Sequence, residues 1–137
     1  MKLFLASVFA LCLSAQTAKV PAPIQTAFTR QFPNAAIKKV AKEKRDGKVV
    51  YEVESTDASH TRDIIYSATG EVIEIEEGID LPALPAPVSA AVKTMYPKAT
   101  ITSAEKITAA NVISYELILK GAPRKEFILT PEGKLVK

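Results

Sequence analysis

The chain has 137 residues, and its 18 basic and 15 acidic residues give a formal net charge of +3. This near balance argues against a nucleic-acid-binding protein, which needs a concentrated basic surface. The one cysteine, Cys12, lies in the first apolar segment, so the remaining chain offers no disulfide, thiol nucleophile or thiolate metal site.

The first 15 residues read as a secretory signal peptide. Lys2 precedes an apolar run over residues 3–13, and small residues follow, with cleavage expected after Ala15 or Ala18. The run is shorter than the roughly 20 residues that cross a bilayer, so we expect no membrane span after signal removal. These features predict a periplasmic or secreted protein.

Two segments of the remaining chain resemble each other: VPAPIQTAFTRQFPNAAI at 20–37 and LPAPVSAAVKTMYPKATI at 84–101. The offset of 64 residues later becomes 63, so that RDIIYSATGEVIE (62–74) meets KEFILTPEGKLVK (125–137). We interpret the match as a tandem duplication, because it preserves the residues that punctuate secondary structure. The matched pairs include Pro21/Pro85, Pro33/Pro97, Tyr51/Tyr115, Glu52/Glu116 and Gly70/Gly133.

Each copy is expected to begin with a short helix. Pro21 and Pro85 suit the first helical position, where an N–H group has no partner in any case. Pro33 and Pro97 end the helix, because proline disfavours helical geometry in the residue before it. Apolar residues at helical spacing lie between these limits: Ile24, Ala27, Phe28 and Phe32, matched by Val88, Ala91, Val92 and Tyr96.

About four strands should follow each helix. Val49, Tyr51 and Val53 alternate with the residues between them at the period of a half-buried strand, and a turn at 45–47 joins this strand to residues 36–44. A turn glycine in SATGEV and in TPEGKL predicts a second hairpin in each copy.

These patterns predict an α+β fold with two tandem copies of a helix followed by about four antiparallel strands, the helix packed on one sheet face. We place the first copy at residues 20–77, a Pro-rich linker at 78–83 and the second copy at 84–137. Residues 20–77 hold 8 basic and 10 acidic residues, whereas 84–137 hold 8 and 4. This difference either assists the docking of the two halves or reflects surface drift after duplication.

Four groups of residues are candidates for chemistry or binding. His60 with Asp57 and Asp63 has the residue types of a transition-metal site, but it reads better as a polar loop that the second copy does not repeat. A second group is acidic and consists of Glu71, Glu74, Glu76 and Glu77. It indicates a solvated strand at an exposed sheet edge, where charges also discourage aggregation. The basic stretch 38–45 indicates a solvated edge hairpin, and the tyrosines are assigned to the core rather than to an interface. These tyrosines are Tyr51, Tyr66, Tyr96 and Tyr115.

The repeated unit, with its helix closed by YP or FP, its YE strand and its final G[EK] hairpin, resembles the PepSY-like family of exported bacterial proteins. That family is similar to the beta-lactamase-inhibitor protein. The resemblance covers residues 20–137 and implies an exported α+β protein whose sheet presents a surface to another protein. It implies no catalytic or ligand-binding residue.

We therefore predict an exported, non-enzymatic module that binds another envelope protein, as an inhibitor or regulator of a protease or hydrolase. The sequence contains no nucleophile elbow and no Gly-rich phosphate loop, and we expect no cofactor and no metal. The alternative hypothesis is a periplasmic carrier of a small ligand or cation, using the acidic strand near Glu74.

Overall fold

The computed structural model describes residues 16–58 and 60–136. The predicted signal peptide, with Cys12, lies outside these residues. Within the described ranges no helix is both long and apolar enough to cross a membrane. In chain order the elements are β1 (Gln16–Thr17), α1 (Ala22–Gln31), β2 (Ala36–Arg45), β3 (Lys48–Thr56), β4 (Thr61–Ser67), β5 (Val72–Ile79), the 3-10 helix η1 (Leu81–Ala83), α2 (Ala86–Met95), β6 (Thr100–Ala109), β7 (Val112–Lys120) and β8 (Glu126–Leu129).

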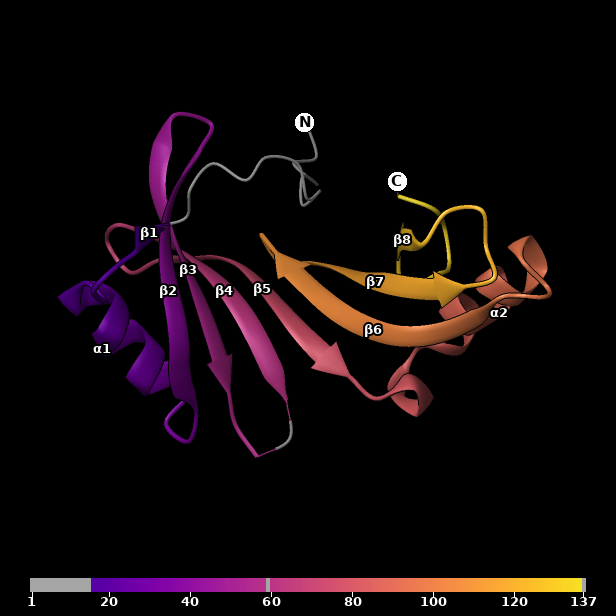
Figure 1. The fold of residues 1–137 in the computed structure, drawn as a ribbon, viewed down its shortest axis with the longest axis horizontal. Coiled ribbons are helices and arrows are strands. Elements are labelled where there is room, and N and C mark those ends of the chain that lie inside the picture. Colours follow the sequence, from indigo (N-terminus) through magenta and orange to yellow (C-terminus); the bar gives the residue numbers. More distant parts are fainter. Residues whose placement is uncertain (1–15, 59, 137) are drawn as a thin grey trace.

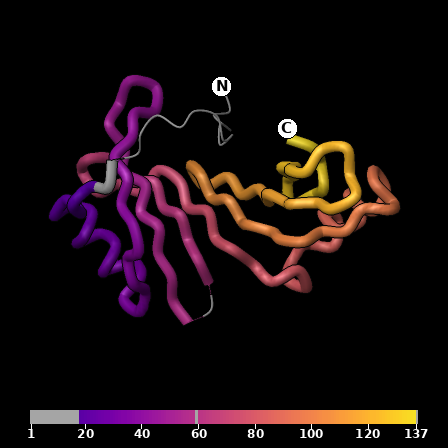
Figure 2. Tube along the Cα trace, in the orientation of Figure 1, coloured from indigo at the N-terminus to yellow at the C-terminus, as the bar shows by residue number. Residues whose placement is uncertain are grey.

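In the described residues the strands form one antiparallel sheet of eight strands in the order β1 to β8, which confirms the α+β class. In Figure 1 they follow one another across the molecule in chain order, and the two helices lie at its opposite ends. The boundary expected at residue 78 does not interrupt the sheet, because β5 runs to Ile79 and pairs with β6. The chain path in Figure 2 runs from β5 through the short turn of η1 directly into α2.

Each helix is limited by proline, although not at the position expected at its start. Pro21 and Pro85 adopt extended geometry just before the first helical residue, and a second proline lies within the first turn. At the other end, Phe32 N–H donates to the Phe28 carbonyl at 2.8 Å, and Pro33 then prevents a further turn. Each helix is therefore ten residues long and depends on packing for its stability.

Each helix shares a core with the strands of its own half. Ile24 and Phe28 of α1 pack in one apolar cluster, and Val88 and Val92 of α2 pack in another. The first cluster also contains the buried residues Val40, Val53, Ile64 and Tyr66, and the second contains Leu84, Ala104, Leu117, Leu119, Phe127 and Leu129.

Strand β5 contributes to both cores. Ile75 packs against the α1 cluster, and Ile79, four residues later, packs against the α2 cluster. Because side chains alternate between the two faces of a strand, Ile75 and Ile79 lie on the same face. Both helices therefore cover one face of the continuous sheet.

Corresponding residues of the two halves have corresponding pairing partners. Ala41 pairs with Glu52, and 64 residues later Glu105 pairs with Glu116. The register shifts between Ile37 and Lys39, and again between Ile101 and Ser103. The strand geometry thus repeats down to an irregularity in the ladder.

The turn glycines of the two halves meet the first turn of their helices. Gly70 and Gly133 have φ of +86° and +79°, a backbone region that L side chains rarely adopt. A Cβ on Gly70 would lie 2.7 Å from the Pro23 carbonyl oxygen, and one on Gly133 would overlap the Pro87 carbonyl oxygen. Glycine is needed at both positions because the turn lies directly against helix backbone.

Candidate protein-binding face

The sheet face opposite the two helices is not covered by any described helix, and we call it the open face. Its residues follow from the register: on β5, Glu74, Glu76 and Gly78 alternate with the helix-facing Ile75 and Ile79. Acidic residues dominate it. By the same alternation its carboxylates are Glu43, Glu52, Glu54, Asp63, Glu74, Glu76, Glu105, Glu116 and Glu126.

Aliphatic side chains lie between these carboxylates. Ile65 faces Glu52 and Glu74 across the strands, and Ile107 and Ile128 occupy similar places in the second half. These three isoleucines are at most 4% exposed. The acidic groups are therefore set in an apolar layer, where the charged form of a carboxyl group is disfavoured.

In the first half, the carboxylates have basic neighbours. Burial raises the pKa of Glu52 to about 7, with Glu43 and Asp63 raising it further and Arg45 opposing them. Arg45 lies 3.6 Å from a Glu43 oxygen and 3.4 Å from Glu74 Oε1. Burial also raises the pKa of Asp63, as does Glu54, while Lys39 opposes this effect.

In the second half, acidic neighbours add to the effect of burial on Glu105 and Glu116, and no basic neighbour opposes the rise in their pKa values. Burial raises the pKa of Glu116 to about 7, and Glu126 and Glu105 raise it further. The pKa of Glu105 is raised by burial, Asp63 and Glu126. Glu105 and Glu116 lie directly opposite each other on β6 and β7. Glu126, on β8, lies opposite Ile118, two residues beyond Glu116 on β7, and we call these three glutamates the carboxylate row. The row forms no ion pair within the described part of the chain.

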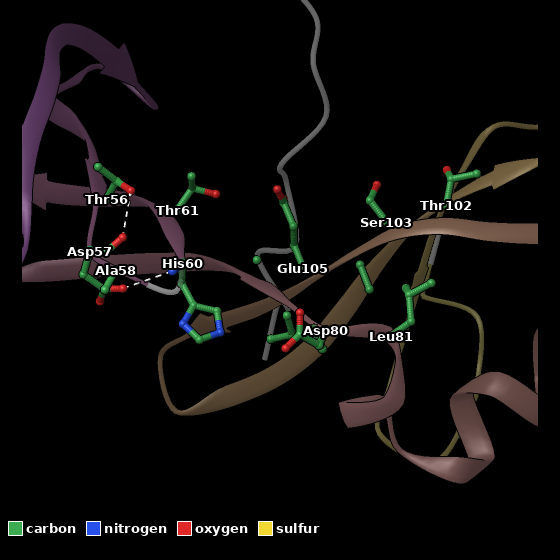
Figure 3. A pocket seen from close by; sticks show the side chains of 13 residues that line it. Thr56, Asp57, Ala58, His60, Thr61, Asp80, Leu81, Thr102, Ser103 and Glu105 are labelled. Atoms are coloured by element: carbon green, nitrogen blue, oxygen red, sulfur yellow. Dashed lines mark hydrogen bonds between the residues drawn. The ribbon is translucent and has the colours of Figure 1, made fainter.

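An open groove of about 610 Å³ lies beside one end of the β5–β6 pair, which joins the two halves. It is formed by the β3–β4 loop, the end of β5 and the start of β6. Figure 3 shows His60 on the loop side of this groove, Asp80 and Leu81 below it, and Ser103 and Glu105 on β6 opposite. Glu105 thus belongs both to the groove and to the open face.

The structure does not bring His60, Asp57 and Asp63 together as metal ligands. Asp57 Oδ1 accepts the His60 backbone N–H at 3.0 Å, and Asp57 Oδ2 accepts a hydrogen bond from Arg62. Arg62 lies over the ring of Phe32 on the helix side of the sheet, whereas Asp63 lies on the open face. No group of three His, Cys, Asp or Glu side chains suited to a metal occurs among the described residues.

The Arg62 ion pairs have a structural role. The guanidinium group is hydrogen-bonded to Asp57 and to Glu77, with Nε 2.8 Å from Glu77 Oε1. Its side chain is 11% exposed, and its pKa is raised: burial opposes the charge, but the bonds to Asp57 and Glu77 outweigh it. Arg62 therefore closes the rim of the first core with both carboxylates satisfied.

The prediction that the acidic strand lies at an exposed edge was wrong. β5 is flanked by β4 and β6, and Glu74 is 9% exposed beside Arg45. An alternating sequence pattern gives the faces of a strand but not its place in the sheet, which depends on how the two halves join. The basic stretch lies on β2, with Lys38, Lys39, Lys42 and Lys44 exposed.

The tyrosines lie against the cores, as expected. Tyr66 is fully buried, Tyr51 packs on the first cluster, and Tyr96 and Tyr115 pack on the second. Sequence reasoning missed Glu52 and Glu116 as surface groups of interest, although their identity in both copies was visible. Their significance depends on their burial and on the strands beside them, which the YE motif alone does not reveal.

A family model described as "Putative beta-lactamase-inhibitor-like, PepSY-like" matches residues 13–74 and 49–137. The chain belongs to this PepSY-like family. Its two overlapping matches together cover both halves of the sheet. No curated protein matches the chain significantly.

Solved structures with the same fold include three proteins from Bacteroides species. A "putative periplasmic" protein from Bacteroides eggerthii DSM 20697 matches with a TM-score of 0.72 and 15% identity, over 88% of each chain. A DUF2874 family protein from Bacteroides uniformis ATCC 8492 matches with 0.70 and 14%, over 87% of this chain and 88% of that one. A BLIP-like protein from Bacteroides fragilis NCTC 9343 matches with 0.68 and 17%, over 88% and 86%. At these identities the likeness establishes the fold alone.

Proposed function

We propose that this chain is an exported, non-enzymatic module that binds another envelope protein through its open face and thereby regulates a protease or hydrolase. The observation that carries the proposal is the pair of equivalent carboxyl groups, Glu52 and Glu116, set among buried isoleucines on a sheet face that no described helix covers. Sheets of this kind offer a broad surface, which suits contact with a protein better than enclosure of a small molecule.

A non-enzymatic role is consistent with the side chains present. The one histidine, His60, lies in a loop whose nearest carboxylate is engaged by Arg62. The inhibitor-like description of the family supports regulation rather than catalysis. Export is supported by the charge, apolar run and small residues at the N-terminus, and by the description of the Bacteroides eggerthii structure.

We also infer that the two halves descend from one ancestral unit. The repeated register, the repeated ladder irregularity and the two glycines against helix backbone support this inference. The duplication explains why similar carboxylate sites recur on one face.

The cation carrier is not favoured by any observation at Glu74. Its carboxylate lies beside Arg45, which already compensates its charge. We therefore propose protein binding alone.

A photo-reactive amino acid at Ile118, an exposed position on the open face, tests the proposal in the cells that produce the protein. We expect one discrete cross-linked protein from this position and none from Lys93, which is exposed on α2. Addition of the purified chain to the captured protein should then change its hydrolytic activity. Equal cross-linking from both positions, or no discrete product from Ile118, would refute binding through the open face.

A further inference from the structure

The two halves of the open face differ in their basic residues. In the first half, Lys39, Arg45 and Lys48 lie on this face by register. The residues 64 positions later are Ser103, Ala109 and Val112, none of which carries a charge.

The acidic residues of this face are partly retained. Glu52 and Asp63 correspond to Glu116 and Glu126, and Ala41 corresponds to Glu105. The second half has therefore kept two carboxylates of the open face and added one, while Ile107 and Ile118 replace Glu43 and Glu54. Residues 84–137 contain four acidic residues against eight basic ones, yet three of those four acids lie in this one row.

The carboxylate row of the second half lacks the compensation found in the first. Arg45 forms ion pairs with Glu43 and Glu74, whereas Glu105, Glu116 and Glu126 form none within the described residues. The second half has Lys120 on the open face. This lysine is exposed at the end of β7, two positions beyond Ile118.

Exposed apolar side chains flank the same row. Val112 is 47% exposed and Ile118 is 36% exposed, and both lie on the open face. Their counterparts in the first half are the charged residues Lys48 and Glu54. The second half therefore combines negative charge that no ion pair compensates with exposed apolar surface.

We propose that the second half of the open face binds a segment of the partner protein that carries arginine or lysine side chains, which take the places that Lys39, Arg45 and Lys48 hold in the first half. This inference rests on the proposed function, since it requires a partner at the open face. A basic side chain has both the charge that Glu105, Glu116 and Glu126 require and an aliphatic stem that packs on Ile118 and Val112.

Binding of a short peptide that alternates arginine with serine tests this inference, measured by calorimetry and by amide chemical shifts of the full chain. We expect the shifts to concentrate at β6, β7 and β8 and the affinity to fall as salt is added. The same peptide with glutamate in place of arginine should not bind.

Two sets of variants distinguish charge compensation from simple loss of a carboxylate. Glu105→Gln with Glu116→Gln removes the negative charge, and Ser103→Lys with Ala109→Arg keeps every carboxylate but supplies the cations of the first half. Both sets should lower the affinity for the peptide at least about tenfold, because close charge pairs contribute this much at interfaces. Arg45→Ala, the matched change in the first half, should not weaken it.

The outcome also separates this inference from the function on which it rests. Peptide binding that is unchanged in both variant sets, or that maps to β2 and β3, would overturn the inference. If cross-linking from Ile118 still captures a partner in that case, the open face remains the binding surface. Loss of the cross-link in both variant sets, together with loss of the peptide, is the result we expect.

Discussion

Glu116 is held between two other carboxylates on a half-buried surface, and this controls how stability depends on pH. Its pKa of about 7 lies above the ordinary value of 4.5, because burial first and then Glu126 and Glu105 disfavour the charged form. The folded state therefore keeps this proton to a higher pH than the unfolded chain does. The free energy of unfolding should fall as the pH rises from about 4.5 to about 7, and then level off.

Glu116→Gln should flatten part of this pH dependence. The variant should gain stability at about pH 8 relative to the parent chain, by on the order of 1 kcal/mol after allowance for solvent screening. Urea unfolding at about pH 5 and about pH 8 measures the effect. Glu71→Gln, at an exposed position, is the control and should follow the parent chain. An unaltered slope in Glu116→Gln would show that Glu116 does not hold the proton.

Tyr66 presents a different case, a fully buried hydroxyl with no hydrogen-bond partner among the described residues. Burial also raises its pKa to about 12. The residue 63 positions later is Leu129, which is fully buried in the second core and has no polar atom to satisfy.

Tyr66→Phe should leave the free energy of unfolding unchanged or raise it by up to about 1 kcal/mol, because it removes a buried polar group that lacks a partner. Thermal or urea unfolding checks this, with the half-buried Tyr51→Phe as the comparison. A loss of more than about 1 kcal/mol would mean that the hydroxyl makes a bond in solution.

At the scale of elements, each of the two turns that contact the helices needs glycine for two reasons, its positive φ and the helix backbone beside it. Gly70→Ala meets both an unfavourable φ and the Pro23 carbonyl oxygen, whereas Gly47→Ala meets only the φ, since no atom lies within 4 Å of the place its Cβ would take. We expect Gly47→Ala to cost about 1 kcal/mol and Gly70→Ala at least about 2 kcal/mol more. Urea unfolding measures both. Equal costs would show that the turn does not press on α1.

The helices and hairpins could be predicted from the sequence because their signals are local. Pro33, the alternation around Tyr51 and the glycine of SATGEV each act within a few residues. The central position of β5 could not be predicted, because its alternating pattern does not indicate that one of its edges pairs with β6. The carboxylate row likewise joins β6, β7 and β8 through register, and only the identity of Glu52 and Glu116 hinted at it.

At the scale of the whole molecule, the pairing of β5 with β6 and the contribution of β5 to both cores make the halves interdependent. Val53 and Leu117 are equivalent, fully buried residues of the two cores. Val53→Ala and Leu117→Ala should each cost about 2–4 kcal/mol, and both should move one shared unfolding transition. Circular dichroism followed with urea tests this. A second transition that responds to only one substitution would show that the halves unfold separately.

The unequal distribution of basic residues on the open face has a consequence before any contact is made. Three basic residues lie on β2 and β3 at one end of the face, whereas the three carboxylates of β6, β7 and β8 have only Lys120 on their side. The electrostatic potential therefore changes along the sheet from one end to the other. A charged molecule that approaches within a Debye length, about 8 Å at physiological salt, would experience a torque as well as an attraction. Although the open face is made of two similar halves, it therefore favours one orientation of a charged partner over the reverse.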